Sequence, residues 1–365
     1  MPQDTLAVAG TGRSPWVWVW GIVAAAAAGG LSWWATLLLR QRNRPKTVRI
    51  EELWVYPIKS CKGHSMKEVE LTKWGLKDDR RYVIVGPESK ALTQRELPKM
   101  VFIHPALPTE KGLLLQALPG SDLPGSKMMA PVLVKQVTEG TVRHVNVWGD
   151  QVAGIDQGDV AASWLQSFLG KEGLRLLFVA PSSKRVVSPE FGVGETAFAD
   201  LFPLLVSNQA SLDDFNTRVA GKVETTLANW RPNIHISGVG PWEEEEIRAL
   251  EIDAPHDSSS MTNGAAKPGT EAPAAARLTL AKPCARCIMT TVDPQTGQRQ
   301  AEGTTLKTLR KVHSGAVLRA KATLHKAFFA REKSASEGFF GVNAFVEMPK
   351  PGLILKVGDT VRVQW

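Results

Sequence analysis

The chain has 365 residues, enough for two domains with separate cores, and its 43% hydrophobic content is ordinary for a globular protein. Its formal net charge of +8 does not indicate a nucleic-acid partner, because no strip interleaves basic with aromatic residues. A nicotinamide site and a haem or iron–sulfur site are also excluded, since the chain has no GxGxxG fingerprint, no CxxCH motif and only three cysteines.

An uncharged segment from Trp16 to Leu39 follows a short tail of residues 1–15 and exceeds the about 20 residues that cross a bilayer as a helix. A cleaved signal peptide is the alternative, because alanines 24–28 offer small-residue cleavage sites. Most nearby positive charges follow the segment, which favours a retained signal anchor with the C-terminal part in the cytosol. The mitochondrial outer membrane and the endoplasmic reticulum membrane both suit such an anchor.

The remainder is predicted to be mainly β with a few helices. Strands are predicted where apolar or β-branched runs alternate and end in turn residues. These runs are Val48–Tyr56, Glu68–Leu71, Tyr82–Val85, Val132–Val137, Arg175–Val179, Ile234–Ser237, Arg277–Leu280, Ile288–Val292, Val342–Val346 and Thr360–Gln364.

Two helices are predicted from apolar residues at helical spacing. The first is capped by Asp159 and stops at Gly170. The second is capped by Ser211, with Asp214 at the capping-box position and Gly221 as its stop. The apolar side chains of both helices are predicted to be core.

A domain division is predicted near residue 180, where a polar, proline-containing stretch interrupts the strand pattern. The two domains would span residues 47–180 and 186–365. Residues 254–276 are rich in Ala, Pro, Ser and Gly and cannot bury a core, so they are predicted to form a flexible surface loop without a catalytic role.

A cysteine pair, Cys284 and Cys287, flanks Arg286 in a turn between two predicted strands. A structural zinc site usually needs four Cys or His ligands, and no second pair follows. A thioredoxin-like redox pair is expected at the start of a helix, and a cytosolic location disfavours a disulfide. Spacing alone leaves soft-metal ligation, redox chemistry and simple burial open.

Four segments in chain order are more specific than the cysteine pair. They are VYPIKSCKG (55–63), DRRY (79–82), NWRPNI (229–234) and PCARCIMTTVDPQTG (283–297). Together they resemble the MOSC-domain family, in particular the mitochondrial amidoxime reducing components, which are molybdenum-cofactor enzymes. The resemblance covers nearly all of residues 48–365. It implies an N-terminal MOSC-type β-barrel domain packed on a C-terminal MOSC β-barrel domain, preceded by one transmembrane helix in the mitochondrial outer membrane.

The resemblance also implies which residues lie at the metal. Cys287 matches the molybdenum ligand, a role that suits a soft thiolate. Cys284 matches a companion cysteine, for which burial as a small residue is the simpler reading. Cys61 is expected to be buried beside the cofactor rather than bonded to it. Asp200 matches an aspartate near the metal with a catalytic role, although Leu and Phe follow it where small polar residues are expected.

The remaining matched positions imply contacts to the molybdopterin part of the cofactor, whose phosphate calls for cations and forked donors. Lys59, Ser60 and Arg80 match contacts to the phosphate and pterin. Arg231 and Asn233 match a further cofactor-contacting pair. Without the resemblance, Lys59 would be read as a surface lysine, Arg231 as an ion-pair residue and Asn233 as a turn former.

The implied reaction is a two-electron reduction of N-oxygenated substrates such as amidoximes, hydroxylamines and N-hydroxylated bases. Electrons would come from cytochrome b5 and NADH-cytochrome b5 reductase, and a basic surface suits the acidic face of such a carrier. One alternative is a sulfur-handling MOSC module in molybdenum cofactor maturation, although those proteins carry a pyridoxal-phosphate domain where this chain has the predicted anchor. The other is a non-enzymatic cofactor-binding protein.

Overall fold

A computed structural model describes residues 44–117, 129–219, 221, 223–253, 274–321, 324–329, 334–347 and 350–365. The chain divides into two units, Met1–Pro45 and Lys46–Trp365, and every described strand and helix lies in the second. The predicted anchor at residues 16–39 and most of the predicted loop, residues 254–273, lie outside the described residues. Within the described ranges, no helix has the length and apolar character needed to cross a membrane.

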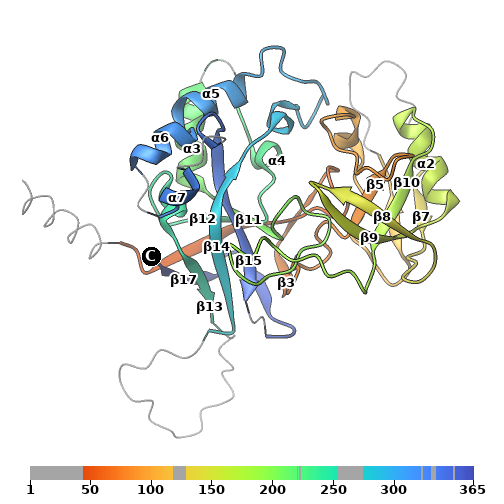
Figure 1. The fold of residues 1–365 in the computed structure, drawn as a ribbon, viewed down its shortest axis with the longest axis horizontal. Helices are drawn as coiled ribbons and strands as arrows, with labels where there is room; N and C mark the ends of the chain where they lie inside the picture. The colour runs from red at the N-terminus through yellow and green to blue at the C-terminus, as the bar shows by residue number, and fades with distance from the viewer. Residues whose placement is uncertain are drawn as a thin grey trace, which may run out of the picture. The chain divides into compact units, whose positions relative to one another are not determined.

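The larger sheet of the second unit runs in the order β12-β11-β15-β14-β13-β17-β1-β2, and an additional pairing of β12 with β1 closes it into a barrel. Figure 1 shows β13 and the long strands β14 and β15 side by side. The β11–β12 pair is parallel, whereas β1 pairs antiparallel with β2, β12 and β17. The bounds are β1 Thr47–Val55, β2 His64–Met66, β11 Leu204–Asn208, β12 Ile234–Ser237, β13 Ala249–Ile252, β14 Ala276–Ala285, β15 Phe339–Glu347 and β17 Thr360–Gln364.

The barrel forms because its strands bury one face. In β1, Val48, Ile50, Leu53 and Val55 are almost fully buried, and their neighbours are more exposed. The alternation shifts between Ile50 and Leu53 because the register with β12 changes there by a bulge. The core that these side chains form takes apolar residues from strands throughout the sheet.

A second sheet is fully antiparallel, in the order β5-β10-β9-β8 (Figure 1). Its strands are β5 Tyr82–Val85, β8 Val142–Val147, β9 Asp150–Asp156 and β10 Arg175–Val179, and helix α2, Asp159–Leu169, packs on it. Shorter pairings join β3 Glu68–Thr72 with β4 Gly75–Leu76 and β16 Ile354–Lys356, and β6 Leu113–Leu115 with β7 Val132–Val134.

The remaining helices are short. The α-helices are α3 Gln209–Val219, α4 Leu227–Trp230, α5 Thr304–Val312, α6 Gly315–Lys321 and α7 Lys326–Phe329, and 3₁₀-helices span Pro98–Phe102, Glu243–Glu246 and Ile288–Thr291. Trp230 and Phe340 stack with ring centroids 4.1 Å apart inside the core between α3, α4 and the barrel. This stack anchors the residue immediately before Arg231.

The predicted fold class, mainly β with a few helices, is confirmed. Strands Tyr82–Val85, Arg175–Val179, Ile234–Ser237 and Thr360–Gln364 have their predicted bounds. The predicted division near residue 180 stays a prediction. Ala276, placed in the predicted loop, is buried and opens β14.

Three local predictions were wrong. Gly158, not Asp159, precedes the first turn of α2 as its N-cap. Ser211 lies inside α3, where its hydroxyl donates to Glu244 at 2.7 Å, and Asp214 binds Arg218 and Trp242 instead of completing a capping box.

The third correction concerns the segment after the cysteines. Ile288–Thr291 is a 3₁₀-helix rather than the start of a strand. The hydroxyls of Thr290 and Thr291 donate to the carbonyls of Cys287 and Ile288, at 3.0 and 2.7 Å. Such local bonds compete with strand pairing and favour a tight turn in spite of the β-branched composition.

Candidate functional site

The first predicted site segment is a turn after β1. Lys59 donates its backbone N–H to the Tyr82 carbonyl (2.8 Å), and Ser60 follows in the left-handed region with φ +64°. The Lys59 side chain is only 5% exposed and forms an ion pair with Asp200. Burial lowers the pKa of the Lys59 ammonium, and the Asp200 carboxylate opposes this shift. The segment therefore presents a buried cation rather than a solvated surface lysine.

Arg80 and Arg231 lie together over one aromatic ring. Their guanidinium carbons are 4.6 and 4.2 Å from the centroid of Tyr56. Arg80 donates to Asp79 at 2.6 Å and to the Arg231 carbonyl at 3.3 Å. Burial raises the pKa of Tyr56 to about 12, so its hydroxyl stays neutral and donates to the Pro232 carbonyl.

Asn233 is 1% exposed and is used within the protein. Its side-chain oxygen accepts from Arg80 at 3.0 Å and from the Leu205 backbone at 3.2 Å, and its amide donates to the Trp54 carbonyl at 3.1 Å. These contacts hold the Arg80 guanidinium in place. A direct contact of Asn233 with the cofactor stays a prediction.

The cysteine segment lies against the same segments. Cys284 lies inside β14 rather than in the predicted turn, and only Cys287 lies beyond the strand. Arg286 donates to the Cys284 sulfur at 3.2 Å and to the Trp230 carbonyl at 2.5 Å. The hydroxyl of Ser60 contacts the Met289 sulfur at 3.9 Å. Cys287 itself is half-buried and lies immediately before the 3₁₀-helix. The structure therefore brings two of the other predicted segments, 55–63 and 229–234, against the cysteine segment, and Arg80 of the remaining segment contacts Arg231.

Cys61 fits the expectation of a thiol that is not a ligand. It is fully buried, and burial raises its pKa to about 12 although Arg231 opposes the shift. A neutral thiol is a poor metal ligand.

Asp200 is half-exposed, with 55% of its side chain open to solvent. Desolvation would raise its pKa, but the ion pair with Lys59 and a hydrogen bond from the Trp148 side chain hold the pKa well below its ordinary value. The carboxylate is therefore ionised throughout the physiological range. Its place near the metal stays a prediction.

The residues present fit an anionic cofactor. Lys59, Arg80, Arg231 and Arg286 gather here, and among the residues that the structure describes only Asp79 and Asp200 oppose their charge by direct ion pairs. Arg231 Nη2 and Arg286 Nε are buried without a hydrogen-bond partner in the described part of the chain. Buried donors of this kind are costly unless they are paired. A bound phosphate or pterin would supply the missing acceptors.

Few of the described side chains are placed to bind a metal ion. No group of three or more His, Cys, Asp and Glu residues is placed to hold a metal ion within the described ranges. A single thiolate from Cys287 fits a metal whose other ligands come from an organic cofactor.

Sequence reasoning did not assign roles to several residues that build this site. Tyr56 and Asp79 lie inside two of the family motifs quoted above, and this position was the signal that could have identified them. Arg185 and Trp148 were missed. Arg185 lies in the stretch read as a domain boundary. Trp148 lies before a glycine between two alternating runs, a weak hairpin signal because Asn, Asp or Gly usually stands at its position.

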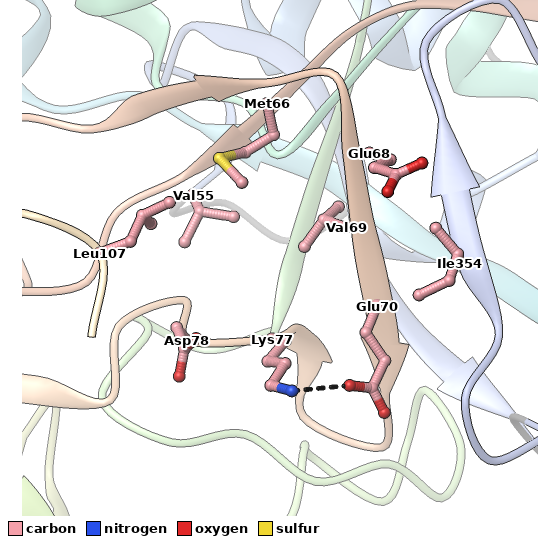
Figure 2. Close-up of a pocket in the computed structure, with 9 residues that line it drawn as sticks. All are labelled: Val55, Met66, Glu68, Val69, Glu70, Lys77, Asp78, Leu107 and Ile354. Atoms are coloured by element: carbon pink, nitrogen blue, oxygen red, sulfur yellow. Dashed lines mark hydrogen bonds and ion pairs between the residues drawn. The ribbon is translucent and has the colours of Figure 1, made fainter. Parts of the chain in front are cut away.

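A separate surface pocket shares none of the predicted site residues. Figure 2 shows the Glu70–Lys77 pair at one side of it, with the two polar groups 2.9 Å apart. Its lining is Val55, Met66, Glu68, Val69, Glu70, Lys77, Asp78, Leu107 and Ile354. Glu68 is also ion-paired, with Lys356. The pocket is therefore not part of the candidate site.

The fold and the site define a two-part MOSC protein. Residues 47–172 match the MOSC N-terminal beta barrel domain, and residues 194–362 match the MOSC domain. The chain is 32% identical to mitochondrial amidoxime-reducing component 1 of Mus musculus, over 89% of this chain and 90% of that protein. It is 30% identical to the Homo sapiens protein of that name, over 96% and 93%.

The chain belongs to the family of the mitochondrial amidoxime reducing components, as its motifs predicted. A molybdenum cofactor sulfurase of Drosophila grimshawi is 29% identical over 76% of this chain but only 32% of its own length.

Lys59→Ala is expected to reduce molybdopterin retention, because it removes one buried cation from the group of Lys59, Arg80, Arg231 and Arg286 that we expect to hold the cofactor, called the cofactor cradle below. A hydrogen bond to a charged group is typically worth about 1.5–3 kcal/mol. Folding should change little, since the remaining Asp200 carboxylate is half-exposed. Pterin content per chain after gel filtration measures the effect, with Lys62→Ala as the matched control.

Equal pterin content in the Lys59→Ala and Lys62→Ala variants would remove Lys59 from the site. Arg80→Ala is less informative, because it leaves Asp79, whose side chain is 1% exposed, without its ion-pair partner. Breaking a buried pair in this way destabilises the fold itself.

Proposed function

We propose that this protein is a molybdenum-cofactor oxidoreductase that reduces N-oxygenated compounds. The observation that carries the proposal is the cluster of Lys59, Arg80, Arg231 and Arg286 beside Cys287, with two buried donors unpaired, in a chain of the amidoxime-reducing family. Cationic side chains suit the cofactor phosphate, and a thiolate suits the metal.

Each residue has one role in this proposal. Lys59, Ser60, Arg80 and Arg231 bind the phosphate and pterin, and Asn233 orients Arg80 through its 3.0 Å hydrogen bond. Cys287 ligates the molybdenum. When bound, the cofactor supplies a metal centre that changes oxidation state by two units.

The overall reaction balances as R–C(NH₂)=NOH + 2 H⁺ + 2 e⁻ → R–C(NH₂)=NH + H₂O. The N–O bond breaks, and its oxygen leaves as water. Asp200 is ionised, half-exposed and paired with Lys59. In this proposal its carboxylate accepts a hydrogen bond from the substrate amino group. The electrons come from outside the chain, and we propose cytochrome b5 and NADH-cytochrome b5 reductase as their source.

Metal analysis and a benzamidoxime assay test the proposal together. The purified holoprotein, reduced chemically, should contain molybdenum and convert benzamidoxime to benzamidine. Molybdenum content without any reduction would instead favour a storage or maturation role, and absence of both would reject the proposal. Adding cytochrome b5 with its reductase and NADH in place of the chemical reductant should restore turnover if the proposed electron source is right.

We further propose that residues 16–39 anchor the protein in the mitochondrial outer membrane with the catalytic part facing the cytosol. The charge pattern around this segment and the mitochondrial relatives support this placement. Protease added to intact mitochondria should then digest the C-terminal part, and alkaline carbonate should not extract the chain. Protection from the protease would reverse the orientation, and extraction by carbonate would argue against a spanning anchor.

A further inference from the structure

A strained tryptophan lies at the turn between β8 and β9. Trp148 has φ +57° and Gly149 has φ +100°. Such two-residue turns favour Asn, Asp or Gly at the first position, and a bulky residue there is an outlier. Trp148 is 55% exposed, which makes it one of the most exposed large apolar residues of the described part of the chain.

A second tryptophan with a left-handed backbone conformation shows which contacts usually offset this strain. Trp242, with φ +66°, stacks on His313 with ring centroids 3.8 Å apart and donates to Asp214 at 2.7 Å. Its conformation is explained by packing. Trp148 has no comparable place in a core, and outliers that packing does not explain gather at functional sites.

The β8–β9 turn is fixed in position beside the candidate site. Arg185, only 6% exposed, donates to the Asp150 carboxylate at 2.8 Å and to the Asp200 carbonyl at 2.5 Å. The same guanidinium reaches the Val147 carbonyl at 3.5 Å and the Ala199 carbonyl at 2.5 Å. One buried arginine therefore joins both flanks of Trp148 to the segment that carries Asp200.

The exposed indole lies between opposite charges. The Arg95 guanidinium lies 4.5 Å from the Trp148 ring centroid. The Trp148 side chain lies near the Asp200 carboxylate and stabilises its charged form, which lowers the Asp200 pKa, and Asp200 pairs with Lys59 of the cofactor cradle. A flat apolar surface thus adjoins a carboxylate acceptor and a guanidinium donor.

We propose that Trp148 is a substrate platform that selects planar aromatic N-hydroxylated compounds over aliphatic ones. The aryl ring lies against the open part of the indole, and the substrate amino group donates to Asp200. Arg185 is the positioning residue that holds the indole and the carboxylate together. The inference rests on the reductase function proposed above and names the substrate class of that site.

The test compares benzamidoxime with acetamidoxime, which carries the same reacting group without the ring. In Trp148→Asn, the ratio of their kcat/KM values should fall about tenfold, the worth of one aromatic contact, chiefly through a higher KM for benzamidoxime. Trp148→Phe keeps a ring and should retain most of the selectivity. Asn suits the left-handed turn, so the Tm of Trp148→Asn should equal or exceed that of the parent. Val160→Asn, at an exposed site on α2, is the control for loss of a surface apolar side chain.

Equilibrium binding of both compounds to the oxidised holoenzyme, measured by calorimetry, gives a readout that does not need turnover. Weaker binding of benzamidoxime alone in Trp148→Asn supports the platform. Equal losses for both compounds, or no loss for either, would overturn it. A defect seen with cytochrome b5 but not with a chemical reductant would also overturn it, in favour of carrier docking. If the parent protein binds benzamidoxime through Trp148 but reduces neither compound, the proposed reductase function is wrong, whereas the role of Trp148 in binding aromatic compounds is supported.

Discussion

Cys287→Ser is expected to reduce amidoxime reduction to near zero while much of the cofactor remains bound. The change replaces a soft thiolate with a hard, mostly protonated hydroxyl, which is a poor donor to molybdenum. Retention is expected because, in the site proposed above, Lys59, Arg80 and Arg231 would bind the cofactor independently of the metal bond. Molybdenum X-ray absorption, together with benzamidoxime turnover, measures both effects.

Cys284→Ser is the matched control and should keep substantial activity. The Cys284 sulfur accepts from Arg286 at 3.2 Å, and a serine hydroxyl can accept the same bond. Cys284 is half-buried rather than a fully buried small residue, so the variant's loss of stability should not exceed about 1–3 kcal/mol, the usual range for an imperfectly satisfied buried polar group. Loss of a Mo–S scatterer in Cys284→Ser but not in Cys287→Ser would reverse the assignment. If neither variant loses one, neither cysteine is the molybdenum ligand.

The strands that could be predicted from the sequence share one property. Tyr82–Val85 and Arg175–Val179 are short apolar runs that pair with each other, so local composition and tertiary burial agree. The β8–β9 hairpin was missed because a tryptophan occupies the turn position where Asn or Asp normally signals a hairpin. Helix α5 was missed because Thr304–Val312 is polar around most of its circumference, and only Leu306 and Leu309 among its apolar residues are buried.

The candidate site, too, could be predicted only in part from the sequence. The family motifs identified Lys59, Arg80, Arg231 and Cys287, and the structure brings their segments together. Motifs could not show how the segments are held. The buried Arg185 bonds to carbonyls on two remote segments, and such backbone contacts leave no trace in residue type.

A buried acid outside the candidate site makes the fold sensitive to high pH. Glu244 is fully buried, and burial, reinforced by the neighbouring Glu245, raises its pKa to about 8 from an ordinary 4.5. Ser211 and Asn208 donate to one of its oxygens, and the other has no partner in the described part of the chain. The folded state therefore prefers the protonated acid.

The sign of the pH effect follows from this preference. Between about pH 4.5 and pH 8 the unfolded chain has lost the proton that the folded chain keeps, so the free energy of unfolding falls as pH rises. Above the folded pKa the loss levels off, at a total on the order of 5 kcal/mol. Buried neutral histidines act in the opposite direction: burial lowers the pKa of His235 to about 4, so its contribution to stability is lost as pH falls.

Glu244→Gln is expected to abolish the decrease in the free energy of unfolding that the ionisation of Glu244 causes at high pH. The amide keeps an oxygen that can accept from Ser211 and Asn208 but cannot ionise. At pH 5 the variant and the parent should unfold with similar free energies, and at pH 9 the variant should be more stable by several kcal/mol, on the order of the proton linkage of Glu244. Urea unfolding of both proteins across this range gives the difference directly, and His235 cancels from it. Glu243→Gln, an exposed neighbour, should leave the profile unchanged. A Glu244→Gln profile parallel to that of the parent would mean that Glu244 is ionised in the folded protein and finds a cation or water in the core.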